Sequence, residues 1–580
     1  MQVIKTLLKS LREFKTPAIL GPVYLIFEVA LECVIPLVMS RLINSMTGES
    51  MEPILQFGLM LIIMAMISLL FGVLSGRYAA KAAAGLAKNL RSDMFERIQG
   101  FDFADIDYFS SSSLITRMTT DVTNVQNAFQ MIIRVAVRAP VMIIFAMTLS
   151  LSINVKMAMI FIIMLPILGG ALFGIALKVM PIFRRIFKKY DALNNSVQEN
   201  VSAIRVVKSF VREDYEIQKF NSASEEVRRD FTFAERILAF NNPIMIACIF
   251  AAIWFVNFLG ARTIVTSGGT ALTTGELSSL ITYGIQVLSS LMMLSFVFVM
   301  VSIAAESAER IAEVLKHQSK LSSPQNGITD VADGSIVFDH VSFKYKEEGE
   351  KYALSDINIA IKSGETVGII GGTGSSKSSL IQLISRLYDV NEGQVKVGGV
   401  NVKDYDLTTL RDSVAVVLQK NVLFSGTIKE NMRWGNENAT DEEILHACKM
   451  AQADEFVQNF PQKYDTYIEA GGTNVSGGQK QRLCIARALL KKPKVLIMDD
   501  STSAVDTKTD ALIRAGMKSE MPDTTKLIIA QRVSSVQDAD RILVMEDGKI
   551  VEMGNHEELM SLNGIYKNIY DSQNKSQEAV

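Results

Sequence analysis

Cysteine, histidine and net charge are all scarce in this chain of 580 residues. It has four cysteines and four histidines, and 59 basic side chains against 61 acidic ones leave a formal net charge of −2. The cysteines, Cys33, Cys248, Cys448 and Cys484, are scattered without CxxC spacing, which argues against a disulfide framework or a zinc site. Because there is no basic surplus to neutralise phosphates, we expect no nucleic-acid partner.

Hydrophobic residues, in contrast, are abundant and unevenly distributed. They make up 49% of the chain, and up to about residue 305 they form long runs with few charges. A helix needs about 20 predominantly apolar residues to cross the hydrocarbon core of a bilayer. Six segments meet this requirement: 15–41, 54–76, 139–155, 157–177, 237–261 and 277–305. We therefore predict an α-helical transmembrane domain of six spans over residues 1–315, embedded in a lipid bilayer.

Lysine and arginine cluster in alternate connections between these segments. They precede the first span and are frequent in the connections 77–138 and 178–236, whereas the intervening connections hold almost none. Because basic residues favour the cytoplasmic side of a membrane, both termini are predicted to be cytoplasmic. The two long connections are helical in pattern, so we expect the spans to continue into the cytoplasm as helices. No cleavable signal is expected at the N-terminus.

A glycine-rich loop follows an apolar, strand-like run in the second half of the chain. The run 365–370 leads into Gly371-Gly-Thr-Gly-Ser-Ser-Lys377-Ser378-Ser379, and an apolar segment follows. In such a loop between a strand and a helix, backbone N–H groups cradle phosphates, the lysine supplies positive charge and the serine hydroxyl can bind Mg²⁺. The residues predicted at the phosphates are Gly371, Gly374, Ser375, Ser376, Lys377, Ser378 and Ser379.

A second glycine-rich segment and a second strand complete a known arrangement. The segment Ser476-Gly477-Gly478-Gln479 precedes a strand-like run, 494–498, which ends in Asp499 and Asp500. The order of these motifs resembles Walker A, the signature and Walker B of ABC transporters. Six spans followed by one α/β P-loop nucleotide-binding domain, here 334–580, resemble an exporter half-transporter. The resemblance implies a bacterial plasma-membrane protein that binds ATP and Mg²⁺ and uses ATP hydrolysis for export.

Further roles follow from this resemblance. It implies that Tyr345 stacks on adenine, that Gln419 of the Q-loop ligates Mg²⁺ or positions water, and that Asp506 belongs to the D-loop facing the other subunit. Asp499 would hold Mg²⁺ together with Ser378. The signature, 476–479, would bind ATP held by a partner subunit. In this family the long cytoplasmic connections end in short coupling helices that dock on nucleotide-binding domains. The polar segment 316–333 is predicted to link the two domains.

Three positions depart from the family pattern. Asp500 stands where the family usually has glutamate, Gln531 where it has histidine, and Ser376 where Walker A has its last glycine. The aspartate carboxylate is one methylene further from the water that it would activate, and glutamine cannot carry positive charge. We therefore predict a site that binds ATP and hydrolyses it slowly, beside an intact signature. This combination resembles one subunit of a heterodimeric exporter, and a slower homodimer is the alternative.

Charged residues within the predicted spans are candidates for the substrate pathway. Glu28 and Glu32 lie four residues apart in the first span, and Arg134 and Arg138 have the same spacing at the start of the third. Because charges facing lipid are unfavourable, these side chains are expected to face the bundle interior. They could line a path for amphipathic small molecules, as in multidrug efflux, or pair with one another for structural reasons. A lipid or peptide exporter and a nucleotide-gated sensor or channel are the other functional alternatives.

Overall fold

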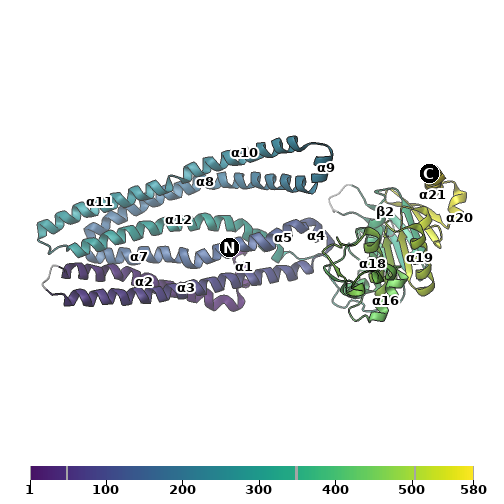
Figure 1. The fold of residues 1–580 in the computed structure, drawn as a ribbon, viewed down its shortest axis with the longest axis horizontal. Helices are drawn as coiled ribbons and strands as arrows, with labels where there is room; N and C mark the ends of the chain where they lie inside the picture. Colours follow the sequence, from purple (N-terminus) through teal and green to yellow (C-terminus); the bar gives the residue numbers. More distant parts are fainter. Residues whose placement is uncertain (1, 47–49, 346–350, 502–503, 579–580) are drawn as a thin grey trace. The chain divides into compact units, whose positions relative to one another are not determined.

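The computed structural model describes residues 2–46, 50–345, 351–501 and 504–578, and it divides into two compact units (Figure 1). The first unit comprises Met1–Gly100 and Ser110–His317, and it is helical. The second comprises Phe101–Phe109 and Gln318–Val580, and it mixes helices with three β-sheets. The architecture predicted from the sequence, a helical transmembrane domain followed by an α/β P-loop domain, is confirmed.

The long helices of the first unit run side by side (Figure 1). They are α1 (Gln2–Lys9), η1 (Arg12–Phe14), α2 (Lys15–Ser45), α3 (Glu52–Gln99), α5 (Ser111–Thr116), η2 (Arg117–Asp121), α6 (Val122–Met131), η3 (Ile132–Ala136), α7 (Val137–Ile153), α8 (Val155–Ser202), α9 (Ile204–Ser209), α10 (Glu213–Leu238), α11 (Asn241–Ser267) and α12 (Thr274–Lys316).

Six helical segments of the described chain are long and apolar enough to cross a membrane. They are Arg12–Ser45, Glu52–Gln99, Ser111–Ile153, Val155–Phe183, Glu213–Ser267 and Thr274–Lys316. Helices α3 and α8 have 48 residues each. At 1.5 Å per residue each is about 72 Å long, more than twice the thickness of the hydrocarbon core. The spans therefore continue as helices well beyond the membrane, as the helical pattern of the long connections predicted.

The boundary between the third and fourth spans differs slightly from the prediction. The uncharged run extends to residue 155, but α7 ends at Ile153, because Asn154 adopts an extended conformation with φ −157° and ψ 114°. Its side-chain oxygen accepts a hydrogen bond from the backbone N–H of Met157 at 3.3 Å and so caps α8. A polar cap can thus end one helix and begin the next within an apolar run.

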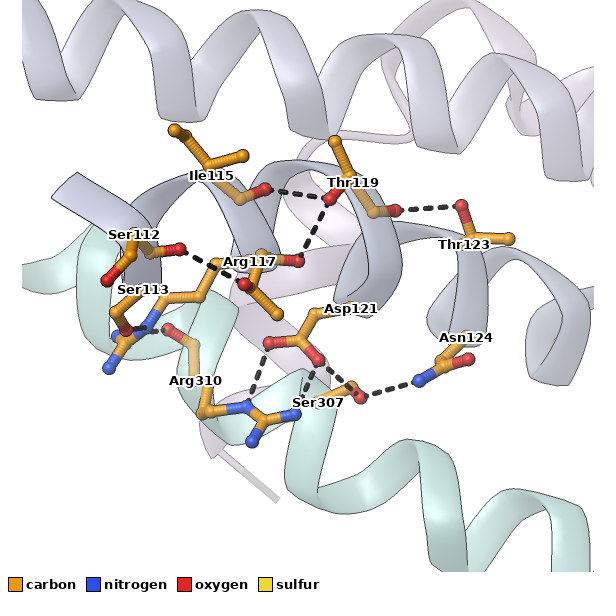
Figure 2. A network of polar contacts seen from close by, with 11 residues as sticks. Ser112, Ser113, Ile115, Arg117, Thr119, Asp121, Thr123, Asn124, Ser307 and Arg310 are labelled. Carbon is orange, nitrogen blue, oxygen red and sulfur yellow. Dashed lines mark hydrogen bonds and ion pairs between the residues drawn. The ribbon is translucent and has the colours of Figure 1, made fainter. Parts of the chain in front are cut away.

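A buried polar network joins the helical extension that precedes the third span to the one that follows the sixth (Figure 2). Asp121, in the π-helical turn η2, is fully buried. Its carboxylate accepts hydrogen bonds from Arg310 Nε and Nη2 of α12 at 2.8 and 2.5 Å and from the Ser307 hydroxyl at 2.9 Å. Asn124 also donates to Ser307 Oγ, at 3.2 Å. A buried carboxylate is tolerated here because a guanidinium and a hydroxyl satisfy it.

The second unit contains the remaining elements. They are α4 (Phe103–Phe109), β1 (Ile336–Phe343), β2 (Leu354–Ile361), β3 (Thr366–Gly371), α13 (Lys377–Ile384), β4 (Glu392–Val397), β5 (Val400–Asn401), α14 (Leu407–Ser413), β6 (Val414–Val417), β7 (Gly426–Thr427), α15 (Ile428–Arg433), α16 (Asp441–Met450), α17 (Asp454–Gln458), η4 (Lys463–Asp465), β8 (Tyr467–Ile468), α18 (Gly477–Leu490), β9 (Val495–Asp499), α19 (Thr507–Glu520), β10 (Thr525–Ile529), η5 (Val533–Ser535), β11 (Arg541–Glu546), β12 (Lys549–Gly554), α20 (His556–Leu562) and α21 (Ile565–Glu578).

A six-stranded sheet with the order β12-β11-β3-β10-β9-β6 forms the centre of this unit. Its strands are parallel except for the edge strand β12, and β9 and β10 are buried along their whole length, as expected for a parallel sheet covered on both faces. Ile529 at the end of β10 is in register with Ile369 and with Asp499. The loops that follow these strands therefore meet at one edge of the sheet. A four-stranded antiparallel sheet, β2-β1-β4-β5, and the pair β7-β8 complete the fold.

Helix α4, from the first long connection, belongs by its contacts to the second unit. Tyr388 donates a hydrogen bond to Asp107 at 2.9 Å, and the Phe103 ring lies 6.1 Å from the Tyr388 ring. Ser319 donates to Asp102 at 2.8 Å. Such docking of a short helix on the nucleotide-binding domain is what the family resemblance implied. The predicted linker also packs on this unit, since Val331 is buried in its core.

Candidate nucleotide-binding site

A cavity of about 540 Å³ lies at the edge of the sheet where the parallel strands end. It is lined by Ile370, Gly371, Gly372, Thr373, Gly374, Ser375, Ser376, Lys377, Ser378, Ser379, Gln419, Asp499, Asp500, Ile529, Gln531, Ile569 and Gln573. The structure thus brings together the predicted phosphate loop, the Q-loop glutamine, both aspartates of Walker B and the switch glutamine. The parallel register explains this, because each of these groups follows a neighbouring strand.

The backbone conformation of the phosphate loop restricts which residue types fit at its positions. A Cβ atom on Gly371 would lie 2.2 Å from the carbonyl oxygen of Met545, so a side chain does not fit there. Gly374 and Ser376 both have left-handed backbones, with φ of 83° and 69°. For a residue other than glycine this conformation costs about 1–2 kcal/mol. Replacement of the last Walker A glycine by Ser376 therefore strains the backbone of the loop.

Lys377 folds over the loop that precedes it. Its ammonium group donates to the carbonyl oxygens of Gly371 and Gly372 at 2.9 and 2.8 Å, and to the Ser375 hydroxyl at 3.2 Å. Burial lowers the pKa of Lys377, and the carboxylates of Asp499 and Asp500 partly oppose this shift. The lysine thus places a positive charge at the point where the loop N–H groups begin α13, which suits a bound polyphosphate.

The two residues predicted to hold Mg²⁺ touch each other. The Ser378 hydroxyl donates to Asp499 Oδ2 at 2.9 Å, and burial raises the pKa of Asp499. Among the described residues no group of three or more His, Cys, Asp or Glu side chains could hold a metal ion. A hydroxyl and one carboxylate nevertheless suit Mg²⁺, which completes its shell with water and substrate phosphates.

Asp500 and Gln531, the two residues that depart from the family pattern at the hydrolytic position, also contact each other. Asp500 has a left-handed backbone with φ 47°, and its carboxylate accepts a hydrogen bond from Gln531 Nε2 at 2.8 Å. Gln419 Nε2 lies 3.4 Å from the same oxygen. Burial raises the pKa of Asp500, and the hydrogen bonds from both glutamines oppose that rise. The carboxylate that would activate water is therefore held by two neutral amides.

Tyr345 is close to this cavity but is not among its described lining residues. Its hydroxyl hydrogen-bonds with Ser379 Oγ at 2.8 Å and Gln382 Oε1 at 3.1 Å. Its ring meets those of Phe343 and Tyr388 edge to face, with centroids 4.9 and 5.2 Å away, and the residue remains 48% exposed. Stacking of adenine on the exposed part of this ring remains a prediction.

The signature lies outside the described lining of its own chain's cavity. Ser476 caps α18, where its hydroxyl accepts from the N–H of Gln479 at 3.3 Å and its N–H donates to Gln479 Oε1 at 2.9 Å. A Cβ on Gly478 would lie 2.9 Å from the Ala504 carbonyl, whereas one on Gly477 would be only in ordinary contact. Asp506 caps α19 by accepting from the N–H of Thr509 at 3.0 Å.

Besides Ile529, which ends β10 and lines the cavity, sequence reasoning missed three residues at this site. Gln481 is buried, donates to the Asp500 carbonyl at 3.3 Å and accepts from the Ala504 N–H at 3.1 Å, so it ties the signature helix to the D-loop. Its place in the helix that follows the signature could have suggested this role. Ile569 and Gln573 come from the C-terminal helix, and no signal in the sequence points to them.

The four charged residues of the predicted substrate pathway also come together. Arg138 donates to Glu28 at 2.6 Å and to Glu32 at 2.5 Å. All three, with Arg134 and Arg77, line a cavity of about 640 Å³ between α2, α3, η3 and α7. The two sequence-based interpretations, pairing and lining of a cavity, are thus compatible.

Two glycines of α3 make room for these charges. A Cβ on Gly72 would lie 3.3 Å from the Glu28 carboxyl carbon, and one on Gly76 would lie 3.6 Å from Arg134 Nη1. Glu28 Oε2 is buried without a hydrogen-bond partner in the described chain. A Cβ at Gly72 would therefore crowd Glu28, whereas one at Gly76 would be in ordinary contact with Arg134.

Comparison with known proteins gives a family match for each half of the chain. Residues 18–301 match the family model of the ABC transporter transmembrane region, and residues 354–503 match that of the ABC transporter. The chain is 36% identical over 567 residues to YfiB of Bacillus subtilis (strain 168), an uncharacterized ABC transporter ATP-binding protein, with 98% of each chain covered. It is 30% identical over 580 residues to the ATP-dependent lipid A-core flippase of Desulfotalea psychrophila, with 99% of each covered.

A solved structure shows the same fold. The structure of a bacterial Atm1-family ABC exporter with ATP bound matches with a TM-score of 0.82 at 22% sequence identity. The match covers 96% of this chain and 98% of that one. It therefore includes both the six long helices and the α/β domain.

Proposed function

This chain belongs to the ABC exporter family, which fuses a transmembrane domain to an ATP-binding domain, and we propose that it is one half of a heterodimeric exporter of drugs or other amphipathic compounds. As a multi-pass membrane protein with an ABC ATPase domain, it couples ATP hydrolysis to transport. In our proposal it lies in a bacterial plasma membrane with both termini in the cytoplasm, as the distribution of lysine and arginine favours.

One observation carries the proposal of unequal ATP sites. The 2.8 Å hydrogen bond from Gln531 to Asp500 joins two of the three positions where the chain departs from the family pattern, and these are the two expected to act on the attacking water and the γ-phosphate. A carboxylate that is shortened by one methylene is a poor base for water, and glutamine brings no positive charge to the γ-phosphate. Binding groups are retained at Lys377 and at the Ser378–Asp499 pair, which suits Mg²⁺–ATP. The site would bind ATP and turn it over slowly.

The signature supports the proposal that this chain completes a fast ATP site in a partner subunit. Ser476, Gly477 and Gly478 begin α18 and are not among the described residues that line their own chain's cavity. The N-terminus of α18 would instead bind the γ-phosphate of ATP held by a partner subunit. A partner with glutamate after its Walker B aspartate and histidine in its switch would complete one fast site and leave one slow site.

Exposed apolar side chains support the need for a partner subunit. At the end of the hairpin formed by α8, α9 and α10 (Figure 1), Val201, Phe210 and Val211 are 66%, 73% and 80% exposed. Exposed apolar side chains at the tip of a hairpin suit an interaction surface. The resemblance implies a coupling helix in this connection, and α9 would dock on a nucleotide-binding domain through these side chains.

The polar cavity between α2, α3 and α7 supports a second candidate, the export of lipids. Three arginines, at positions 77, 134 and 138, face two glutamates there, so the lining has an excess of positive charge. Such a cavity suits an amphipathic molecule with an anionic head group better than a cationic drug. Transport of labelled anionic and cationic amphiphiles into inverted vesicles separates the two candidates.

The central test compares two variants of the complex purified with its natural partner. Ser476→Ala should lower steady-state ATPase more than tenfold, because it acts in the partner's fast site. Asp500→Ala should lower it less than threefold, because its own site already contributes little. An equal loss in both variants would refute the unequal sites. The heterodimer itself would be refuted if the chain purified alone hydrolysed ATP at the typical enzyme rate of about 10 s⁻¹.

A further inference from the structure

The C-terminal helix α21 is anchored so that one of its faces points at the nucleotide cavity. Glu552 of β12 accepts hydrogen bonds from the N–H groups of Ile565 and Tyr566, at 2.5 and 3.0 Å, and so caps the start of this helix. The Tyr566 ring is fully buried in a cluster with Ile370, Ile528 and other core residues. Residues three, four and seven positions further along lie on the same helical face, and these include Ile569 and Gln573.

Both polar atoms of the Gln573 side-chain amide form hydrogen bonds with the backbone next to Gln531. Its Nε2 donates to the carbonyl oxygen of Gln531 at 2.7 Å, and its Oε1 accepts from the N–H of Val533 at 2.9 Å. A single side chain thus fixes the backbone on both sides of Arg532, where β10 leaves the sheet. The Gln531 side chain that starts from this fixed backbone reaches Asp500 at 2.8 Å. Gln573 also lines the nucleotide cavity itself.

We propose that Gln573 is a positioning residue for ATP hydrolysis at this chain's own site, acting through the backbone that presents Gln531. The catalytic role of a switch side chain depends on its placement, because a shift of about 1 Å can change a rate about a hundredfold. ATP binding depends instead on the phosphate loop, which Gln573 does not hydrogen-bond. Loss of Gln573 therefore lowers the rate of hydrolysis and leaves the affinity for ATP unchanged.

This inference rests on the proposed nucleotide site but not on the heterodimer. The full-length chain is purified alone in lipid nanodiscs, so that every site contains this cavity, and both ATP affinity and single-turnover hydrolysis of radiolabelled ATP are measured. Gln573→Leu removes both hydrogen bonds with little change in size. Gln573→Glu keeps the acceptor for Val533 but sets a carboxylate oxygen against the Gln531 carbonyl. Asn568→Leu, an exposed position on the same helix, is the matched control.

We expect Gln573→Leu to hydrolyse ATP about tenfold more slowly than the wild type, with an affinity within twofold. Gln573→Glu should be slowed as well, and Asn568→Leu should not. In a Gln531→Ala background, Gln573→Leu should have no further effect, since its action passes through Gln531. An unchanged rate, a similar loss in the Gln531→Ala background, or a matching loss of ATP affinity would each overturn the inference. Failure of the wild type to bind ATP would refute the proposed nucleotide site instead.

Discussion

Replacement of Asp500 by glutamate should make this chain's own ATP site faster. The substitution adds one methylene and moves the carboxylate outward by about 1.5 Å, the length of one C–C bond. Asp500 is the group held by Gln531 at 2.8 Å, so the change acts on the carboxylate that we propose to activate water. The longer side chain would restore the family's usual reach toward the γ-phosphate.

The expected gain in hydrolysis rate follows from how far the Asp500 carboxylate lies from the family's usual position. A displacement of about 1 Å in a reacting group costs about a hundredfold in rate, which corresponds to about 2.7 kcal/mol of barrier. Gln531 still brings no positive charge, so we expect only part of this gain, between about tenfold and a hundredfold. Asp500 has a left-handed backbone, which aspartate tolerates better than glutamate. A loss of stability of up to about 1 kcal/mol should accompany the gain in rate.

The assay is single-turnover ATP hydrolysis by the full-length chain in lipid nanodiscs, with the thermal midpoint measured for each variant. Asp500→Asn is the matched control, because it has the same size but cannot accept a proton, and it should hydrolyse more slowly than the wild type. If Asp500→Glu binds ATP and is no faster than the wild type, the reach of this carboxylate does not limit hydrolysis. The explanation of the slow site would then be wrong.

Two further predictions concern stability. Ser376→Gly should raise the free energy of unfolding by up to about 1 kcal/mol, because it removes a left-handed strain of about 1–2 kcal/mol but adds entropy to the unfolded chain; a lower thermal midpoint would contradict this. Asp121→Asn should lower the free energy of unfolding by about 1–3 kcal/mol, because the substitution weakens the hydrogen bonds to Ser307 and to Arg310, which is half-exposed. Thr119→Ala, at an exposed position of the same turn, is the control, and equal midpoints for both variants would exclude a special role for Asp121.

Much of this protein could be predicted from local sequence. The six spans follow from apolar runs, because the bilayer requires about 20 such residues wherever they occur. The position of the phosphate loop follows from a strand, glycines and a helix in immediate succession, and Asp499 was identified because it ends a fully apolar strand. These features depend on neighbours along the chain, and the structure has them where they were expected.

Other features were decided only by the tertiary structure. The hydrogen bond from Gln531 to Asp500 depends on the register of β10 beside β9, and the spacing of the two residues in the sequence does not reveal it. Arg138 could have paired with either glutamate, and the packing of α2 against α7 lets it contact both. Gln573 reaches the nucleotide cavity because Glu552 and the core anchor α21. A linear pattern records which side chains share a face, but only packing determines what that face meets.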